Sequence, residues 1–280
     1  MDTQTEASPT RPPWFIDLLK RNFKYRFTLA KASRIPGVGA LMSRMLFDGD
    51  DLVYLPKDSV VEVAVNRQVP VPDTVPLPSC IVHGFIDEAS FHWIMDFCIC
   101  REANKCEDYP RDLGCLFMGE AARRIDPKLG HPATREEAHA HIRRADEAGL
   151  IHVIGRNKLD AVWLDVSPGE KLLTVCNCCP CCCLWKMLPS LNGAISGRVT
   201  RMEGVEVTVG EGCAGCGACQ EVCFVDAIEI EEGKARITDQ CRGCGRCVEA
   251  CPNKAITLTA PTPQAIEDTV RRIGGSVDVK

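Results

Sequence analysis

The residues in this chain best suited to chemistry are cysteines, and eight of them follow one spacing pattern that occurs twice. The pattern C-x2-C-x2-C-x3-C begins at Cys213 and begins again 28 residues later at Cys241. The two runs comprise Cys213, Cys216, Cys219 and Cys223, then Cys241, Cys244, Cys247 and Cys251. Thiolates at these intervals are the ligand pattern of paired [4Fe–4S] clusters, which carry single electrons.

Residues 205–260 resemble the bacterial two-cluster ferredoxin domain, because the doubled run is followed at one offset by the apolar segments 227–230 and 255–258. The resemblance implies an α+β fold of two βαβ repeats, written (βαβ)2, and two [4Fe–4S] clusters with crossed ligation. It assigns cluster 1 to Cys213, Cys216, Cys219 and Cys251, and cluster 2 to Cys241, Cys244, Cys247 and Cys223. Phe224 follows Cys223 where the family usually has proline. The uniform spacing is not that of a zinc ribbon.

A denser group of cysteines lies upstream, in the segments CICREANKC and CNCCPCCC and between them. Its ten members are Cys98, Cys100, Cys106, Cys115, Cys176, Cys178, Cys179, Cys181, Cys182 and Cys183. Ten thiols exceed the need of one cubane, so we expect one or two further iron–sulfur clusters, one of which could be larger than a cubane. Structural zinc and a metal-free redox thiol pair are the alternatives. The block resembles uncharacterised ferredoxin-domain proteins of anaerobes, which implies no particular activity.

Local spacing predicts how some upstream thiols share a centre. Alternate side chains of an extended chain point to one side, so Cys98 and Cys100 are expected to face one centre. Arg101 and Lys105 lie in the same loop and would stabilise a reduced, more negative cluster, unless they are solvated surface charges.

The second upstream segment contains a proline that restricts its backbone. Pro180 favours an extended conformation at Cys179. An extended run would place Cys179, Cys181 and Cys183 on one face and Cys182 on the other. Cys80 is a candidate eleventh thiol. His83, His92 and His152 could ligate a metal or carry protons, but a structural role is the simpler expectation.

The order of motifs predicts five segments. They are a disordered tail (1–13), a basic helix and strand region with a Pro-rich linker (14–78), a Cys-rich metal or cluster domain (79–200), the ferredoxin domain (201–260) and a closing helix and tail (261–280). The spacing of apolar residues predicts a helix over 14–30, strands within 52–72 and a helix over 86–96.

In the Cys-rich domain, Thr134 and Glu137 form a capping box ahead of a helix over 135–148. Strands are predicted over 151–154 and 161–166, around a turn at 155–158. Helix, helix and hairpin is a winged-helix-like order within a mixed helical domain. Residues 116–165 nevertheless contain eight basic and eight acidic groups, so nucleic-acid binding is not expected.

Charge is unevenly distributed. The formal net charge is −5, yet residues 11–47 carry eight Lys or Arg and one Asp. A basic, amphipathic helix over 14–30 would suit docking to a partner or to a membrane surface, although packing on its own core is equally compatible with the pattern. No segment is apolar enough to span a membrane, and residues 1–13 do not form a secretory signal. We therefore expect a cytoplasmic protein, with the inner membrane face as an alternative.

The expected function is transfer of low-potential electrons between a redox partner and the upstream Cys-rich centre. The sequence contains no Rossmann or P-loop fingerprint, so a flavoprotein, hydrogenase or dehydrogenase partner would bind any nucleotide or flavin. A reductase with its own catalytic site upstream is the first alternative, and an iron–sulfur assembly or metal-trafficking protein is the second. Clustered C-x-x-C spacing in a reducing compartment argues against a disulfide framework.

Overall fold

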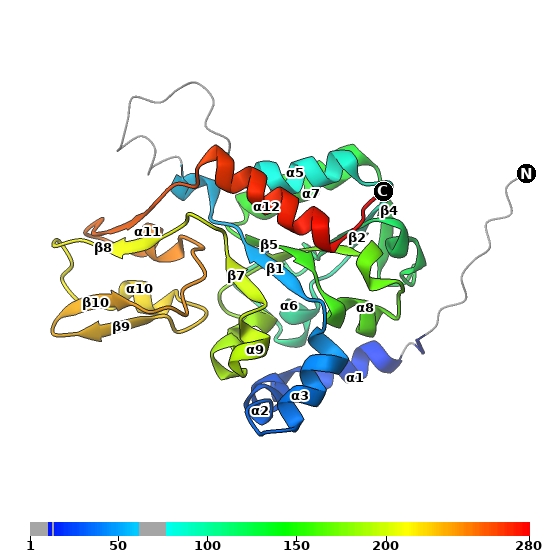
Figure 1. Ribbon diagram of the computed structural model, residues 1–280, viewed down its shortest axis with the longest axis horizontal. Coiled ribbons are helices and arrows are strands. Elements are labelled where there is room, and N and C mark those ends of the chain that lie inside the picture. The colour runs from blue at the N-terminus through cyan, green and yellow to red at the C-terminus, as the bar shows by residue number, and fades with distance from the viewer. Residues whose placement is uncertain (1–10, 13, 62–76) are drawn as a thin grey trace, which may run out of the picture.

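A seven-stranded sheet forms the centre of the protein in the computed structural model, which describes residues 11–12, 14–61 and 77–280 (Figure 1). The strand order is β4-β2-β3-β6-β5-β1-β7. Neighbouring strands are antiparallel except for β1 and β7. The strands are β1 (Asp51–Tyr54), β2 (His92–Met95), β3 (Leu116–Met118), β4 (Gly130–Ala133), β5 (Ile151–Arg156), β6 (Leu173–Cys178) and β7 (Val199–Arg201).

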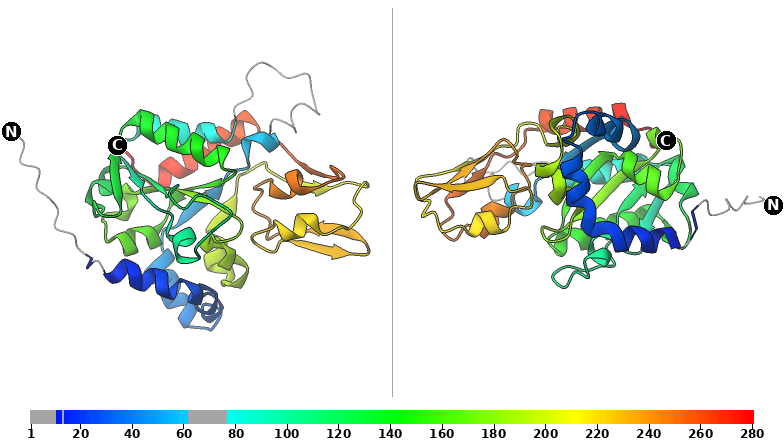
Figure 2. Two further views of the ribbon diagram at one scale, coloured as in Figure 1. Left: turned by 180° about the vertical axis from the view of Figure 1, so that it is seen from behind. Right: turned by 90° about the horizontal axis from the view of Figure 1, so that it is seen from below.

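Helices cover both faces of this sheet (Figures 1 and 2). One face packs against α5 (Ser79–Glu88), α7 (Arg135–Glu147) and α12 (Pro263–Ser276). The opposite face is covered by α1 (Trp14–Asn22), η1 (Phe23–Tyr25), α2 (Arg26–Ala32), α3 (Val38–Met42), η2 (Ser43–Phe47), α6 (Ile99–Ala103), η3 (Glu120–Arg124), α8 (Lys158–Leu164), η4 (Gly169–Lys171), η5 (Leu184–Ser190) and α9 (Gly193–Ser196). The core is thus divided into two layers by the sheet.

Residues 205–260, called the repeat unit below, project from one end of the sheet between β7 and α12 (Figure 1). Its elements are β8 (Val207–Val209), α10 (Ala218–Glu221), β9 (Ile228–Glu231), β10 (Lys234–Ile237), α11 (Arg246–Ala250) and β11 (Ile256–Leu258). β8 pairs with β11 and β9 pairs with β10, both antiparallel. The chain is therefore a mixed α and β protein, and α12 returns from the repeat unit to pack on the sheet.

Several elements lie where the sequence predicts them. The capping box at the start of α7 is present, with the Glu137 N–H donating to Thr134 Oγ1 and the Thr134 N–H donating to the Glu137 carboxylate. Gly149 follows α7 with a φ of 71°, the left-handed conformation that ends many helices. The hairpin of β9 and β10 turns at Glu232 and Gly233.

Two predictions in the first hundred residues are wrong. Among the described residues of the predicted strand region over 52–72, only those of β1 form a strand, and Val60 and Val61 are helical. Residues 62–76 lie outside the described part of the chain. The predicted helix over 86–96 is also misplaced, because α5 ends at Glu88 and residues 92–95 form β2. Every residue of β2 is buried, and a short buried apolar run has no periodicity that separates strand from helix.

The hairpin predicted after α7 is also wrong. Residues 151–156 form β5, but residues 158–164 form helix α8 instead of a second strand. β5 pairs with β6 and β1, which are distant in sequence. The helix–helix–hairpin order behind the winged-helix expectation is therefore not present.

The predicted helix over 14–30 is divided into α1, η1 and α2. Phe15, Ile16 and Leu19 pack on the core beneath the sheet, so one side of this segment is structural. Trp14 and Leu29 are 61% and 59% exposed, so the other side offers apolar surface to solvent. In the described part of the chain, no helix has the length and apolar character needed to cross a bilayer.

Candidate metal centres

Two small cavities in the repeat unit are each lined by four cysteines, and each cavity takes one of the four from the other run. The first has a volume of about 10 Å³ and is lined by Cys213, Cys216, Cys219 and Cys251. The second has a volume of about 20 Å³ and is lined by Cys223, Cys241, Cys244 and Cys247. These are the two groupings that the family resemblance implies. Four thiols around an enclosed space are the donor set that iron–sulfur clusters use, while ligation itself stays a prediction.

Backbone N–H groups point at the sulfur atoms of both cavities. Ala227 N lies 3.3 Å from Cys223 Sγ, and Ala255 N lies 3.3 Å from Cys251 Sγ, at the same 28-residue offset. Such donors stabilise a thiolate and raise the reduction potential of a cluster that it ligates. The loop between the first two cysteines requires glycine, since a Cβ on Gly215 would lie 2.3 Å from the Gly233 oxygen.

The two cavities differ in exposure. Cys216, in the first cavity, is the one cysteine classed as exposed among the nineteen, all of which the structure describes. N–H groups of Ala235 and Gly215 lower the pKa of Cys213 there. In the second cavity, burial raises the pKa of Cys244 to about 11, and burial also raises the pKa of Cys247. The first cavity therefore faces solvent, and the second faces the interior.

The upstream thiols are positioned by β6, a central strand of the sheet. Cys176 and Cys178 alternate with Asn177, so the two thiols share one face and the amide lies on the other. Asn177 Nδ2 donates to the Gly114 carbonyl at 2.8 Å, and Asn177 Oδ1 lies 2.9 Å from His152 Nδ1. This buried network fixes the end of β6 and hence the orientation of both thiols.

The ten upstream cysteines separate into two sets. The first set, called the six-cysteine cavity, comprises Cys98, Cys100, Cys115, Cys176, Cys178 and Cys183, which line one cavity of about 270 Å³. The second set, called the four-cysteine group, comprises Cys106, Cys179, Cys181 and Cys182, whose Sγ atoms all lie within 4.8 Å of one another. Cys179 lies at the border and also lines the cavity.

The sequence-based grouping of these thiols is partly wrong. Cys182 joins Cys179 and Cys181, whereas Cys183 lies 3.2 Å from Cys178 and faces the cavity. The cause is a turn at residues 180–182 where an extended run was predicted, with the Cys182 N–H donating to Cys179 Sγ.

Cys98 and Cys100 do face one cavity, as expected, but not through an extended chain. Cys98 is the N-cap of α6, and Cys100 lies in its first turn.

The six-cysteine cavity is far larger than the two cavities of the repeat unit. Apolar side chains from three parts of the chain form much of its wall, including Phe23 of η1, Trp163 of α8 and Trp185 of η5. It also contains a buried carboxyl group, Asp160, which accepts hydrogen bonds from Trp163 Nε1 and Asn157 Nδ2. Burial raises the pKa of Asp160 to about 6. The volume of the six-cysteine cavity is more than ten times that of either cavity in the repeat unit.

A fully buried cation lies beside these thiols. Arg101 is 0% exposed and donates to the main-chain carbonyls of Asn177 and Leu113. Burial alone would lower its pKa, but the charges of Cys98, Cys179 and Cys178 raise it. Among the described residues, none of the ion pairs with carboxylates involves Arg101. Thiolate sulfur at these cysteines would supply the counter-charge of this guanidinium. Lys105 is exposed, in line with the solvated alternative.

The second cavity of the repeat unit and the six-cysteine cavity share one apolar core. Phe224 is buried, and its ring lies 5.0 Å from the ring of Tyr54 in β1. Both aromatic residues belong to the hydrophobic cluster that contains Cys183 and contacts Cys178 and Cys244. The departure from proline at position 224 thus has a structural role, since the aromatic ring packs the repeat unit against the sheet.

Arg246 forms a polar connection between the second cavity of the repeat unit and the six-cysteine cavity. It lies between Cys244 and Cys247 in sequence, and its guanidinium donates to the Cys178 carbonyl at 3.0 Å.

Sequence reasoning missed Arg246, Tyr54 and Asp160 as site residues. Arg246 could have been found from its place inside the ligand run, but Tyr54 and Asp160 come from distant elements.

Other candidate groups have structural partners. His92 Nε2 bonds to the Ile86 carbonyl, and His83 pairs with His139 at 2.7 Å between ring nitrogens. Cys80 lies in α5 and packs in the layer of the core on the face of the sheet that α5, α7 and α12 cover.

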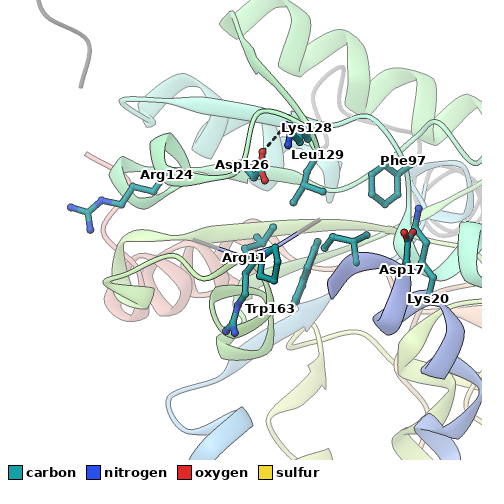
Figure 3. A pocket seen from close by; sticks show the side chains of 12 residues that line it. Arg11, Asp17, Lys20, Phe97, Arg124, Asp126, Lys128, Leu129 and Trp163 are labelled. Carbon is teal, nitrogen blue, oxygen red and sulfur yellow. Dashed lines mark hydrogen bonds between the residues drawn. The ribbon is translucent and has the colours of Figure 1, made fainter. Parts of the chain in front are cut away.

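A separate cavity of about 210 Å³ is lined by charged side chains, including Arg11 and Lys128, and no cysteine lines it (Figure 3).

The cysteine-lined cavities of the repeat unit and the comparison with protein families together support an iron–sulfur cluster-binding domain. The model described as the LdpA Fe-S cluster-binding domain matches residues 218–261. This match covers six of the eight repeat-unit cysteines, and Cys213 and Cys216 precede it. No curated protein and no solved structure matches the chain. The repeat unit is therefore similar to one iron–sulfur-binding domain, and the rest of the chain is outside the match.

The buried guanidinium leads to a stability prediction. Arg101→Met would leave the carbonyls of Leu113 and Asn177 without their donor, at a cost of about 1–3 kcal/mol for each buried group. We expect the anaerobically purified Arg101→Met variant to unfold at a lower urea concentration than the unmodified protein. Lys105→Met, at the exposed neighbouring cation, is the matched control and should leave the midpoint unchanged. Equal midpoints for both variants would show that Arg101 does not hold the site together.

Proposed function

We propose that this chain is an iron–sulfur electron-transfer protein in which the repeat unit exchanges electrons with the upstream thiol centre. The observation that supports this most directly is the shared core, where Phe224 and Tyr54 lie between the second cavity and the six-cysteine cavity. Apolar, close-packed contact excludes water between two redox centres and holds them in fixed relative positions. A chain that only bound separate metals would not need this contact.

In this proposal the repeat unit is of the two-cluster ferredoxin type. The thiols of each cavity hold one [4Fe–4S] cluster, which when bound supplies one-electron chemistry. The residues of the first cavity include the exposed Cys216, so this side is where a partner protein would exchange electrons. Residues 203–260 carry ten acidic and five basic groups, which would favour a partner with a basic docking face.

The upstream centre is proposed to be a further iron–sulfur centre held by the six-cysteine cavity. Arg101 compensates negative charge there, and Arg246 fixes the backbone at Cys178. Docking of a partner or a membrane face through residues 14–30 stays a prediction. The side chains of Trp14, Leu18, Tyr25 and Leu29 support it, since they are large hydrophobic groups exposed to solvent.

An assembly or metal-trafficking role is less well supported. Such a protein hands its metal to others, which requires exposed and labile ligands. None of the ten upstream cysteines is classed as exposed, and Cys98, Cys106, Cys179, Cys182 and Cys183 are buried.

A reductase is the second candidate function, and the size of the six-cysteine cavity favours it. Its volume of about 270 Å³ could admit a small substrate such as a thiol or disulfide beside a bound cluster. Asp160 at its wall has the raised pKa expected of a group that donates protons.

The reductase candidate can be tested with a small thiol as a probe. If an iron keeps an open position, adding 2-mercaptoethanol to the reduced protein should change the EPR spectrum of the upstream centre. Leu159→Trp, at the cavity wall, should abolish the change by filling the space. A spectrum that the thiol leaves unchanged in the unmodified protein would exclude the reductase and leave electron transfer as the function.

Crossed ligation in the repeat unit predicts which double variants lose one cluster and which lose two. Cys223→Ser and Cys244→Ser each affect the second cavity, so each variant and their combination should lose about four irons per chain. Cys219→Ser with Cys223→Ser affects both cavities and should lose about eight. Iron and acid-labile sulfide counts after anaerobic purification measure this. If the pair Cys219 and Cys223 loses only about four irons, each run ligates its own cluster and the crossed assignment is wrong.

A further inference from the structure

The four-cysteine group differs in geometry from the other cysteine sites. Cys106 Sγ and Cys181 Sγ are 3.5 Å apart, and all four sulfur atoms lie within 4.8 Å of one another. Among the described residues, no other set of three or more cysteines, histidines or carboxylates was found so closely gathered. The cysteines of the repeat unit instead surround cavities of about 10 and 20 Å³, and no three of their sulfur atoms all lie within 4.8 Å of one another. The four-cysteine group therefore encloses a smaller space.

The spacing of the sulfur atoms indicates what this group can hold. A tetrahedral zinc ion with Zn–S bonds of about 2.3 Å places its ligand atoms about 3.8 Å apart. A cubane cluster has four irons and four sulfides between its thiolates, so its ligand atoms must stand further apart. Sulfur atoms in near contact fit a single ion and leave no space for a cluster.

The surroundings match a structural site. Cys179 and Cys182 are buried and pack with Leu113, Ala145 and Leu150 in a small hydrophobic cluster. The Cys182 N–H donates to Cys179 Sγ at 3.3 Å, which stabilises a thiolate ligand. Closed four-cysteine sites with no open position are the structural class of zinc site.

The group also joins distant segments. Cys106 lies in the loop after α6, and the other three lie in the turn after β6, 75 residues away in the case of Cys181. The segment between β2 and β3 that contains this loop has a single short helix, α6, and few buried apolar residues. An ion bound to all four thiols would hold this loop against β6 and thereby position Cys98 and Cys100 at the six-cysteine cavity.

We propose that Cys106, Cys179, Cys181 and Cys182 bind one zinc ion with a structural role. The other six thiols, which line the six-cysteine cavity together with Cys179, then remain available to a second upstream centre. This inference does not depend on the proposed electron-transfer function, because a structural zinc site would be present whatever the other cysteines bind.

The test is a metal count on the full-length chain. Protein produced with both zinc and iron available, and purified anaerobically, should contain about one zinc per chain by mass spectrometry. Cys181→Ser should lose the zinc. Cys80→Ser, at a cysteine outside every site, is the matched control and should keep both metals.

X-ray absorption at the zinc edge gives a second readout on the unmodified protein, which remains informative if Cys181→Ser does not fold. Four sulfur neighbours at about 2.3 Å are expected. Two results would overturn the proposal. One is a chain without zinc in which Cys181→Ser loses about four irons, which would mean a cluster. The other is one iron in place of zinc in a four-sulfur environment.

Discussion

Negative charge on buried sulfur is the constraint on which the rest of this structure depends. A thiolate inside a protein is costly unless metal, hydrogen-bond donors or cations compensate it. The fold supplies hydrogen-bond donors and cations near the end of β6. Arg101 lies beneath the thiols without a carboxylate partner among the described residues, and Arg246 reaches the same strand from the repeat unit. The network around Asn177 holds the strand so that its cysteines face this region.

The arrangement of elements follows from bringing two thiol-rich parts together. The repeat unit is inserted between β7 and α12, and α12 returns to the sheet, so both ends of the unit are fixed to the same core (Figure 1). This attachment turns the second cavity inward and leaves the first facing solvent. Phe224, at the position where ferredoxin-type sequences usually have proline, provides the apolar contact with Tyr54. Such a gradient of exposure, from surface to interior, suits a protein that accepts electrons at its surface and stores or uses them inside.

The sequence predicted what local rules determine. The capping box at Thr134 and the hairpin at Gly233 depend on neighbouring residues, and the doubled run carries its own spacing. The exchange of Cys223 and Cys251 between cavities followed from the family resemblance. The rest depends on distant contacts. β2 is buried on both faces and shows no alternation, so its sequence does not distinguish a strand from a helix. Cys106 joins Cys181 from 75 residues away, and no local pattern predicts that Cys182 and Cys183 serve different sites.

In the electron-transfer proposal, electrons reach the upstream centre through the repeat unit. The most direct test is stopped-flow mixing with a small reduced ferredoxin, followed by rapid freezing and EPR of the signal that Cys98→Ala removes. We expect Cys244→Ser, which disrupts the second cavity, to slow reduction of the upstream centre by at least about tenfold. Reduction at the same rate in Cys244→Ser and in the unmodified protein would contradict it.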